Sequence, residues 1–180
     1  MTPPLSRLLV AALTVTMLGL PAAALAQTAD TLTGDTLTGD ASAIGPDIIT
    51  IGTQRVVLLG IDAPEANQTC GDNSNIWKCA DTAFAVLDQT VKGGPVTCTL
   101  KGTPDPFGKR NGVCTVGGKD VARELVKQGL AVIYPHDPES RDYAADQQAA
   151  KNAKQGLWGD GITFVNPWEY RIKHNHTPFK

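Results

Sequence analysis

The chain has 180 residues, with 16 Lys and Arg against 18 Asp and Glu, and a formal net charge of −2. This length fits one domain with a sizeable core and leaves little room for a second. The slight acidity counts against a protein that grips nucleic acid through a general excess of positive charge.

The first 26 residues have the three parts of a secretory signal peptide. Arg7 is their only charge, an apolar run follows over 8–20, and Ala24-Leu25-Ala26 matches a small-residue cleavage site. A membrane anchor is the alternative, but the apolar run is shorter than the roughly 20 residues that a bilayer span needs. We therefore expect cleavage before Gln27, no membrane attachment afterwards, and a periplasmic or secreted protein.

Residues 27–40 contain a duplicated Thr-Leu-Thr-Gly-Asp, at 31–35 and 36–40. This polar repeat has no core-forming period, so we predict a flexible lead-in over 27–40. The folded domain is then expected over 41–171, followed by a C-terminal tail over 172–180.

The apolar pattern predicts strands and helices in alternation from residue 48 onwards. Strands over 48–51 and 55–59 form a hairpin around a Gly-Thr turn, and apolar residues at helical spacing predict a helix over 76–91. Strands at 96–100 and 112–116, a short helix at 119–128, a strand at 131–134 and a helix at 139–155 follow. Because the order lacks βαβ regularity, it indicates an α+β fold around a small barrel.

Four cysteines form an even set in an exported chain, which favours disulfides over metal ligation: Cys70, Cys79, Cys98 and Cys114. Three pairings are formally possible. Cys98 and Cys114 lie in the two β-like runs on either side of a turn-rich segment. If those strands pair, a cross-strand bridge joins these two cysteines and the other pair pins a loop.

Carboxylates concentrate where the second strand of the hairpin ends. Asp62 and Glu65 lie three residues apart in Gly60-Ile61-Asp62-Ala63-Pro64-Glu65, and the hairpin brings Asp47 near Asp62. Grouped carboxylates suit calcium or magnesium, and a carboxylate held off the metal can activate water. The alternative is an ordinary turn in which Asp62 caps backbone amides.

Residues 51–65 closely resemble the strand-and-turn signature of the thermonuclease, or staphylococcal-nuclease-like, family. The segments 105–109, 124–131 and 155–158 resemble its Asp-x-Tyr-Gly-Arg turn, its second helix and the end of its third helix. The cysteine-containing stretch 68–79 and the closing stretch 166–171 are similar to a bacterial exported branch. The resemblance spans about residues 37–171. It implies a five-stranded OB-fold-type β-barrel with three α-helices.

In active family members the resemblance implies calcium-assisted phosphodiester hydrolysis of DNA and RNA. It assigns Asp47, Asp62 and the backbone carbonyl of Ala63 to the metal, and Glu65 to activation of the attacking water. Calcium is the implied cofactor, and DNA, RNA or a nucleotide is the implied ligand. We expect a monomer, and the sequence identifies no protein partner.

Two arginines of the family's phosphate site are replaced in this chain. Val57 stands five residues before Asp62, where the family has one arginine, and Lys109 stands at the position of the second. Valine supplies no charge, and lysine keeps the charge without the planar, bidentate donors of arginine. Arg55, on the same strand face as Val57, and Arg110 are candidate replacements, with an ordinary surface charge as the alternative for each.

Loss of one preorganised donor typically costs about 10² to 10³ in rate. We therefore expect weakened or absent nuclease activity, with Lys109 a partial substitute. The alternative is a non-catalytic periplasmic module on the same fold, which binds nucleic acid, a nucleotide or a protein.

Overall fold

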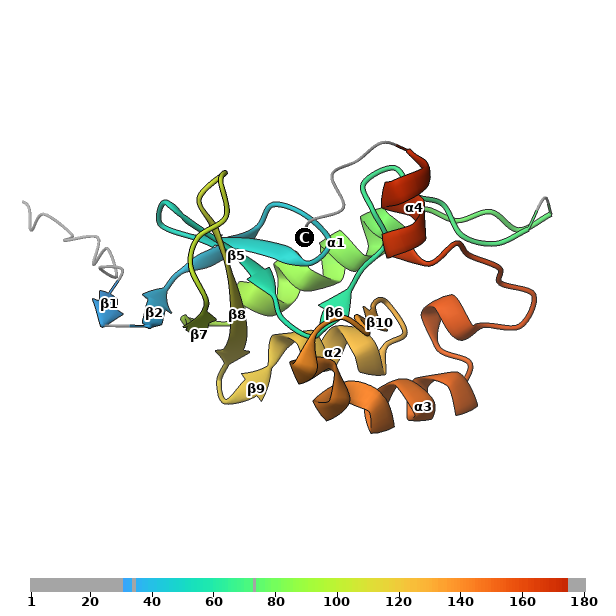
Figure 1. Cartoon of the computed structure of the whole chain (residues 1–180). Coiled ribbons are helices and arrows are strands. Elements are labelled where there is room, and N and C mark those ends of the chain that lie inside the picture. The colour runs from blue at the N-terminus through green and yellow to red at the C-terminus, as the bar shows by residue number, and fades with distance from the viewer. Residues whose placement is uncertain (1–30, 34, 73, 175–180) are drawn as a thin grey trace, which may run out of the picture.

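The computed structural model describes residues 31–33, 35–72 and 74–174 (Figure 1). The predicted signal peptide and residues 175–180 of the predicted tail lie outside these ranges. No helix within them is long and apolar enough to cross a membrane.

The strands form one eight-stranded sheet and one two-stranded pair. The main path runs through β1 (Thr31–Thr33), β2 (Thr36–Gly39), β7 (Val96–Lys101), β8 (Lys109–Val116), β5 (Gln54–Leu58), β4 (Ile48–Ile51) and β3 (Ala41–Ala43), with β9 (Lys119–Asp120) on β8. The pair consists of β6 (Ile61–Asp62) and β10 (Val132–Ile133). Contacts between β5 and β8 are parallel and the other pairings are antiparallel.

The predicted α+β class is confirmed, but the predicted closed barrel is not. The hydrogen-bonded path through the described strands runs from β1 to β3 without returning to its start. In the part of the chain that the structure describes, four α-helices accompany the sheet: α1 (Cys79–Val91), α2 (Val121–Lys127), α3 (Ala144–Asn152) and α4 (Pro167–Lys173). Short 3₁₀ turns, η1 (Pro138–Tyr143) and η2 (Gly156–Trp158), flank α3. Three of the four helices match the predicted ones, and α4 is additional.

Residues 167–173 fold into α4 because the residues at its start satisfy the open end of a helix. Asn166 is the N-cap, and its side chain accepts a hydrogen bond of 3.1 Å from the backbone N–H of Trp168. Pro167 occupies the first turn, where its missing N–H costs nothing. Glu169 in the first turn and Lys173 in the last complement the helix dipole.

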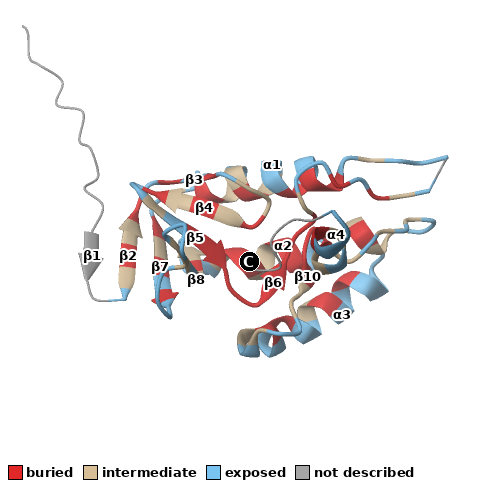
Figure 2. Ribbon diagram, turned by 45° about the horizontal axis from the view of Figure 1, so that its top comes forward, coloured by how far each residue is buried: buried red, intermediate tan, exposed pale blue. Residues whose placement is uncertain are grey.

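The core lies between the sheet and the helices. The apolar stripe of α1 is buried and packs against β3 and α2, while α2 also packs against α3 and β8. Figure 2 shows the buried residues on the inner faces of the strands and helices, with exposed residues on their outer faces. The helical spacing that predicted α1 is thus the spacing of its core contacts.

Part of the segment predicted as a flexible lead-in belongs to the sheet. Strand β2 pairs with β7, with Leu37 opposite Cys98 and Thr38 opposite Thr97. Leu37 is buried, and the hydroxyl oxygens of Thr38 and Thr97 lie 3.1 Å apart. The Thr-Leu-Thr repeat has the two-residue alternation of a strand, and an edge of the sheet was open to receive it.

The two strands that contain Cys98 and Cys114 do pair, and both disulfides form as predicted for that case. Cys98 and Cys114 are direct partners across β7 and β8 and form one bond, and Cys70 and Cys79 form the other, next to the start of α1. The described residues contain no free cysteine. The Cys98–Cys114 bond joins two core strands. The Cys70–Cys79 bond closes a loop between two cysteines that are nine residues apart in the sequence.

Gly129 should tolerate a side chain far less well than Gly117. Both have positive φ, but a Cβ at Gly129 would lie 2.1 Å from the backbone oxygen of Gln155, whereas Gly117 faces open space. We expect Gly117→Ala to lower the free energy of unfolding by about 1 to 2 kcal/mol, the cost of the left-handed backbone. We expect Gly129→Ala to cost at least about 2 kcal/mol more. Urea unfolding of both variants measures the difference, and equal losses would contradict the collision expected with Gln155.

Candidate functional site

Asp62 is the last residue of β6, and Glu65 lies in the turn that follows. Asp62 lies opposite Val132 of β10 and is buried, with 1% of its surface exposed. The chain enters β6 through Gly60, whose φ of +81° favours glycine. The N–H of Gly60 donates a 2.8 Å hydrogen bond to Asp137, and a Cβ there would lie 2.7 Å from the Tyr143 ring. The hydrogen bond to Asp137 and the packing on Tyr143 therefore fix the backbone at Gly60, two residues before Asp62.

The hairpin of β4 and β5 places Asp47 against this turn. The backbone oxygen of Asp47 accepts a 2.9 Å hydrogen bond from the N–H of Leu58. Its carboxylate oxygen Oδ2 accepts a 3.3 Å hydrogen bond from the N–H of Ala63. Both Asp47 and Ala63 are buried. Three residues assigned to the metal site by the family resemblance thus lie in one region: Asp47, Asp62 and Ala63.

Arg171 of α4 binds the carboxylates of Asp62 and Glu65. Its Nη1 and Nη2 donate to the two oxygens of Asp62, at 2.8 and 3.1 Å, and Nη1 also donates to Oε1 of Glu65. The Arg171 side chain is 5% exposed and that of Glu65 is 26% exposed. This is a two-point arginine–carboxylate pair, extended to a second carboxylate.

The pKa values follow from burial and from these contacts. Burial raises the pKa of Glu65, and the carboxylates of Asp47 and Asp62 raise it further, while Arg171 opposes both. A raised pKa is the direction that favours a general base near neutral pH. Burial alone would lower the pKa of Arg171, but the hydrogen bonds and charges of Asp62 and Glu65 outweigh it and raise that pKa. Arg171 therefore stays charged.

This arrangement does not fit a calcium ion. Calcium takes about six to eight oxygen ligands. Here the guanidinium of Arg171 holds both oxygens of Asp62 and one of Glu65. Nowhere in the described ranges do three His, Cys, Asp or Glu side chains form a group that could hold a metal. The cation that these two carboxylates contact comes from the chain itself.

An apolar side chain, Val57, occupies the position at which the family resemblance implies an arginine. It is 1% exposed and lies on β5 opposite Ile48 of β4. Its neighbours Val56 and Leu58 belong to the main core cluster, whereas Val57 does not, as the alternation of a strand requires. Position 57 therefore offers no donor to a phosphate.

The other three basic candidates lie where β5 and β8 run side by side. Arg55 is exposed and pairs in register with Lys109, and Val56 pairs with Arg110. The ammonium of Lys109 lies 3.5 Å from the carboxylate of Asp105. Arg110 donates at 3.1 Å to Asp35 and at 2.8 Å to the backbone oxygen of Gly102.

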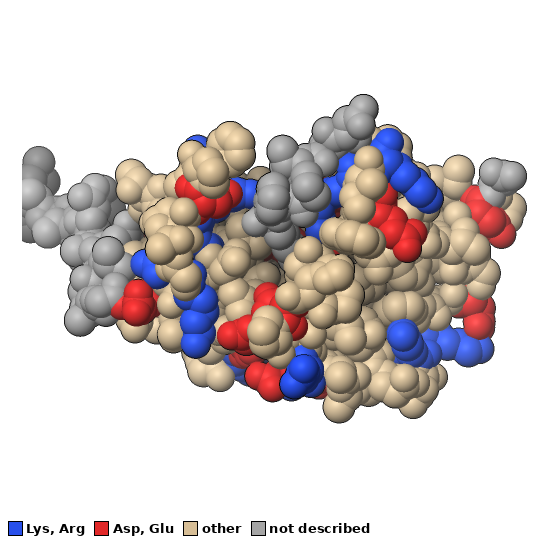
Figure 3. Space-filling model, in the orientation of Figure 1, with Lys and Arg blue, Asp and Glu red and all other residues tan. Residues whose placement is uncertain are grey.

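These contacts direct Arg110 away from Lys109, as expected for successive residues of a strand. Arg55 and Lys109 therefore form the basic pair of this sheet face, and Arg110 braces a loop. On the face seen in Figure 3, basic and acidic side chains of the described residues are interspersed.

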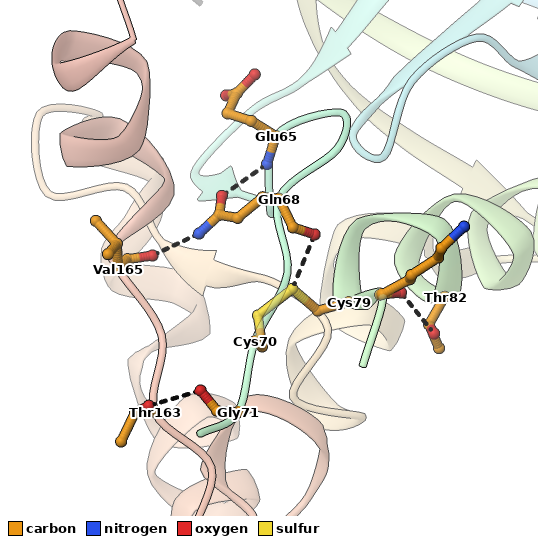
Figure 4. Close-up of a disulfide and its surroundings, with 9 residues drawn as sticks. Glu65, Gln68, Cys70, Gly71, Cys79, Thr82, Thr163 and Val165 are labelled. Atoms are coloured by element: carbon orange, nitrogen blue, oxygen red, sulfur yellow. Dashed lines mark hydrogen bonds between the residues drawn. A yellow bond between two sulfur atoms is a disulfide. The ribbon is translucent and has the colours of Figure 1, made fainter. Parts of the chain in front are cut away.

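Gln68 connects the Glu65 turn to the segment that leads into α4. Its side-chain oxygen accepts a 2.9 Å hydrogen bond from the N–H of Glu65, and its Nε2 donates at 2.7 Å to the backbone oxygen of Val165 (Figure 4). Gln68 is buried. Sequence reasoning gave it no role, because its two partners lie 3 and 97 residues away.

The Cys70–Cys79 disulfide contacts the segment 68–71, which also binds the residues before α4. Sγ of Cys79 lies 3.5 Å from the backbone oxygen of Gln68. Next along the chain, the N–H of Gly71 donates at 2.7 Å to the backbone oxygen of Thr163, whose hydroxyl donates back at 2.8 Å. Figure 4 shows these contacts in a row between the disulfide and the segment before α4. They place α4 over the carboxylates.

Arg171 is the site residue that sequence reasoning missed. A signal for its helix was present: Asn166 followed by Pro167, with Glu169 three residues after the Asn, is a helix start. The pairing of Arg171 with Asp62 spans 109 residues and left no local pattern.

Comparison with known proteins gives a consistent picture. A family model described as staphylococcal nuclease homologue matches residues 55–160. The succinoglycan biosynthesis protein ExoI of Rhizobium meliloti is 36% identical over 139 residues, which cover 76% of this chain and 72% of that protein.

Two fungal proteins named probable endonuclease LCL3 are also similar. That of Schizophyllum commune is 27% identical over 138 residues, or 68% of this chain and 46% of the fungal protein. That of Zygosaccharomyces rouxii is 39% identical over 61 residues, or 31% of this chain and 22% of its own length. The chain thus spans less than half of either endonuclease.

Gln68→Glu should destabilise the protein although the two side chains have the same shape. The carboxylate keeps an acceptor for the N–H of Glu65 but sets a second oxygen against the carbonyl of Val165, inside a buried site. We expect the free energy of unfolding to fall by about 2 to 3 kcal/mol. Gln148→Glu, on the exposed face of α3, is the matched control and should change it by less than about 0.5 kcal/mol. Urea unfolding under oxidising conditions measures both, and similar values would refute the role given to Gln68.

Proposed function

The chain belongs to the staphylococcal nuclease family, and from this we propose that it is an exported member whose hydrolysis of DNA and RNA is reduced by several orders of magnitude. The observation that carries the proposal is Val57, a buried apolar side chain where the family resemblance implies an arginine. Lys109, at the second arginine position, lies beside the carboxylate of Asp105. The site thus retains its carboxylates and lacks its planar phosphate donors.

The chemistry of phosphoryl transfer explains why these changes matter. The transition state places negative charge on three equatorial oxygens, and arginine stabilises it with paired N–H donors. Lys109 offers a point charge, and that charge is already partly balanced by Asp105. Glu65 keeps a pKa shifted in the direction of a general base, but a base alone leaves the charge on the phosphate uncompensated.

Export is supported by the two disulfides, which fit an oxidising compartment, and by the signal-peptide pattern of residues 1–26. We propose the periplasm or the extracellular medium as its location.

A non-catalytic binding role is the second candidate. Arg55 is exposed and lies in register with Lys109, so two cations face the same side of the sheet. Phe107, in the loop before β8, is 68% exposed, and an exposed aromatic ring near cations suits the stacking of unpaired bases. ExoI, the relative that this chain covers over 72% of its length, is named for succinoglycan biosynthesis rather than for cleavage of nucleic acid.

Cleavage of single-stranded DNA tests the first candidate. We expect the natural mature protein to cleave at least about 10²-fold to 10³-fold more slowly, with calcium present, than a variant carrying Val57→Arg, Lys109→Arg and Arg171→Gln. This variant supplies the phosphate donors and releases the carboxylates. Adding Glu65→Gln to it is the control and should abolish the gain. Calcium-dependent cleavage by the natural protein that Glu65→Gln removes would overturn the proposal.

Binding without cleavage tests the second candidate. We expect single-stranded DNA to bind more weakly to Arg55→Ala and Lys109→Ala, each of which should reduce the slope of log Kd against log salt by about 1. Lys127→Ala, on the exposed end of α2, is the control and should leave the slope unchanged. Fluorescence anisotropy at several salt concentrations measures both. Equal slopes in all variants would exclude this surface.

A further inference from the structure

We infer that Arg171 is the resident cation of the carboxylate site: its guanidinium takes the place of a divalent metal at Asp62 and Glu65 and excludes calcium from them. The inference goes beyond the proposed function, because it concerns what the carboxylates bind and not whether DNA is cleaved. Residue 171 lies outside the stretch 55–160 that the family model matches.

The first argument is that the same oxygen atoms would serve both cations. Arg171 donates to both oxygens of Asp62 and to one oxygen of Glu65. A calcium ion would need these oxygens as direct ligands. Two cations on one carboxylate repel each other in a site where Asp62 is 1% exposed and water screens little. Calcium therefore enters only if the guanidinium leaves.

The second argument is the balance of charge. Asp62 and Glu65 share one guanidinium, and the carboxylate of Asp47, which accepts a hydrogen bond from the N–H of Ala63, adds a third negative charge at the same turn. Buried carboxylates without a counter-charge are strongly destabilising. The folded site therefore requires a cation, and Arg171 supplies one in every molecule at any metal concentration.

The third argument excludes a role for Arg171 as a substitute phosphate donor. Both hydrogens of Nη1 are used, one on Asp62 and one on Glu65, and Nη2 donates to Asp62. The side chain is 5% exposed. Its Nε has no hydrogen-bond partner but is buried, so burial keeps the remaining N–H groups from a phosphate in solvent, and Arg171 does not replace the arginine missing at position 57.

The fourth argument is that the chain holds Arg171 in place. The capped start of α4 orients the helix, and the segment before it is bound to residues 68–71 through Gln68, Gly71 and Thr163. The Cys70–Cys79 bond lies next to this strip. A guanidinium on a helix that is already fixed in place loses little conformational entropy when it binds the carboxylates, whereas an ion from solution loses translational entropy. This difference favours the guanidinium.

Calcium binding to Arg171→Gln tests the inference. Glutamine removes the charge and can still donate to Asp62. We expect the natural protein to show no saturable calcium binding by isothermal titration calorimetry at millimolar calcium. The variant should bind one calcium ion with a Kd of about 10⁻⁴ to 10⁻³ M, the range of weak protein calcium sites. Adding Asp62→Asn should abolish that binding.

Arg123→Gln is the matched control. Arg123 pairs with Asp146, which joins α2 to α3, so its loss should free no oxygen of Asp62 or Glu65 and create no calcium binding at them. Saturable binding by the natural protein that Asp62→Asn removes would overturn the inference, as would a folded Arg171→Gln that binds calcium no better than the natural protein.

A variant that fails to fold also decides the question. If Arg171→Gln is unfolded in EDTA, the inference requires calcium to restore a cooperative thermal transition by circular dichroism, because the metal then supplies the missing charge. Failure of calcium to restore folding would overturn the inference. Because these measurements report metal binding and folding, their outcome is independent of the cleavage assay.

Discussion

The buried ion cluster of Arg171, Asp62 and Glu65 is the constraint around which the rest of this molecule is arranged. Removing charges from water costs several kcal/mol per ion, and their mutual attraction repays this only when the geometry is good. Good geometry requires both ends of the pair to be fixed. On the carboxylate side, Gly60 and the β6–β10 pair fix the turn. On the other side, Gln68 and the cap of α4 fix the guanidinium.

In this chain, two carboxylates that the family resemblance assigns to metal binding and water activation are paired with an arginine. Asp62 and Glu65 share the guanidinium of Arg171, and Asp47 lies against the same turn with its carboxylate on the N–H of Ala63. At the phosphate side, Val57 is apolar and Lys109 lies beside Asp105. On both sides of the site, charged groups are thus paired with other groups of the protein itself.

Most of the helices and strands could be predicted from the sequence, because the spacing of apolar residues and the turn-forming residues determine them locally. The stripe of α1, the strands around Val56 and Cys98, and the end of α2 at Gly129 follow from periodicity and turn chemistry. Strand β2 was missed because its composition is polar and repetitive, and only the free edge of β7 reveals its use. Closure of the sheet into a barrel was inferred from the order of the elements and from the family resemblance, and it is not seen in the described strands.

The candidate site was predictable on one side only. The hairpin and the Asp62–Glu65 turn are neighbours in sequence, so their proximity follows from a two-residue turn. Arg171 reaches them from 109 and 106 residues away, and no local pattern encodes a contact of that span. The order of assembly follows from the same span. A seven-residue helix does not persist alone, so α4 forms only as it docks. The pairing of the guanidinium with the carboxylates is therefore a tertiary contact that forms together with α4 and cannot precede it.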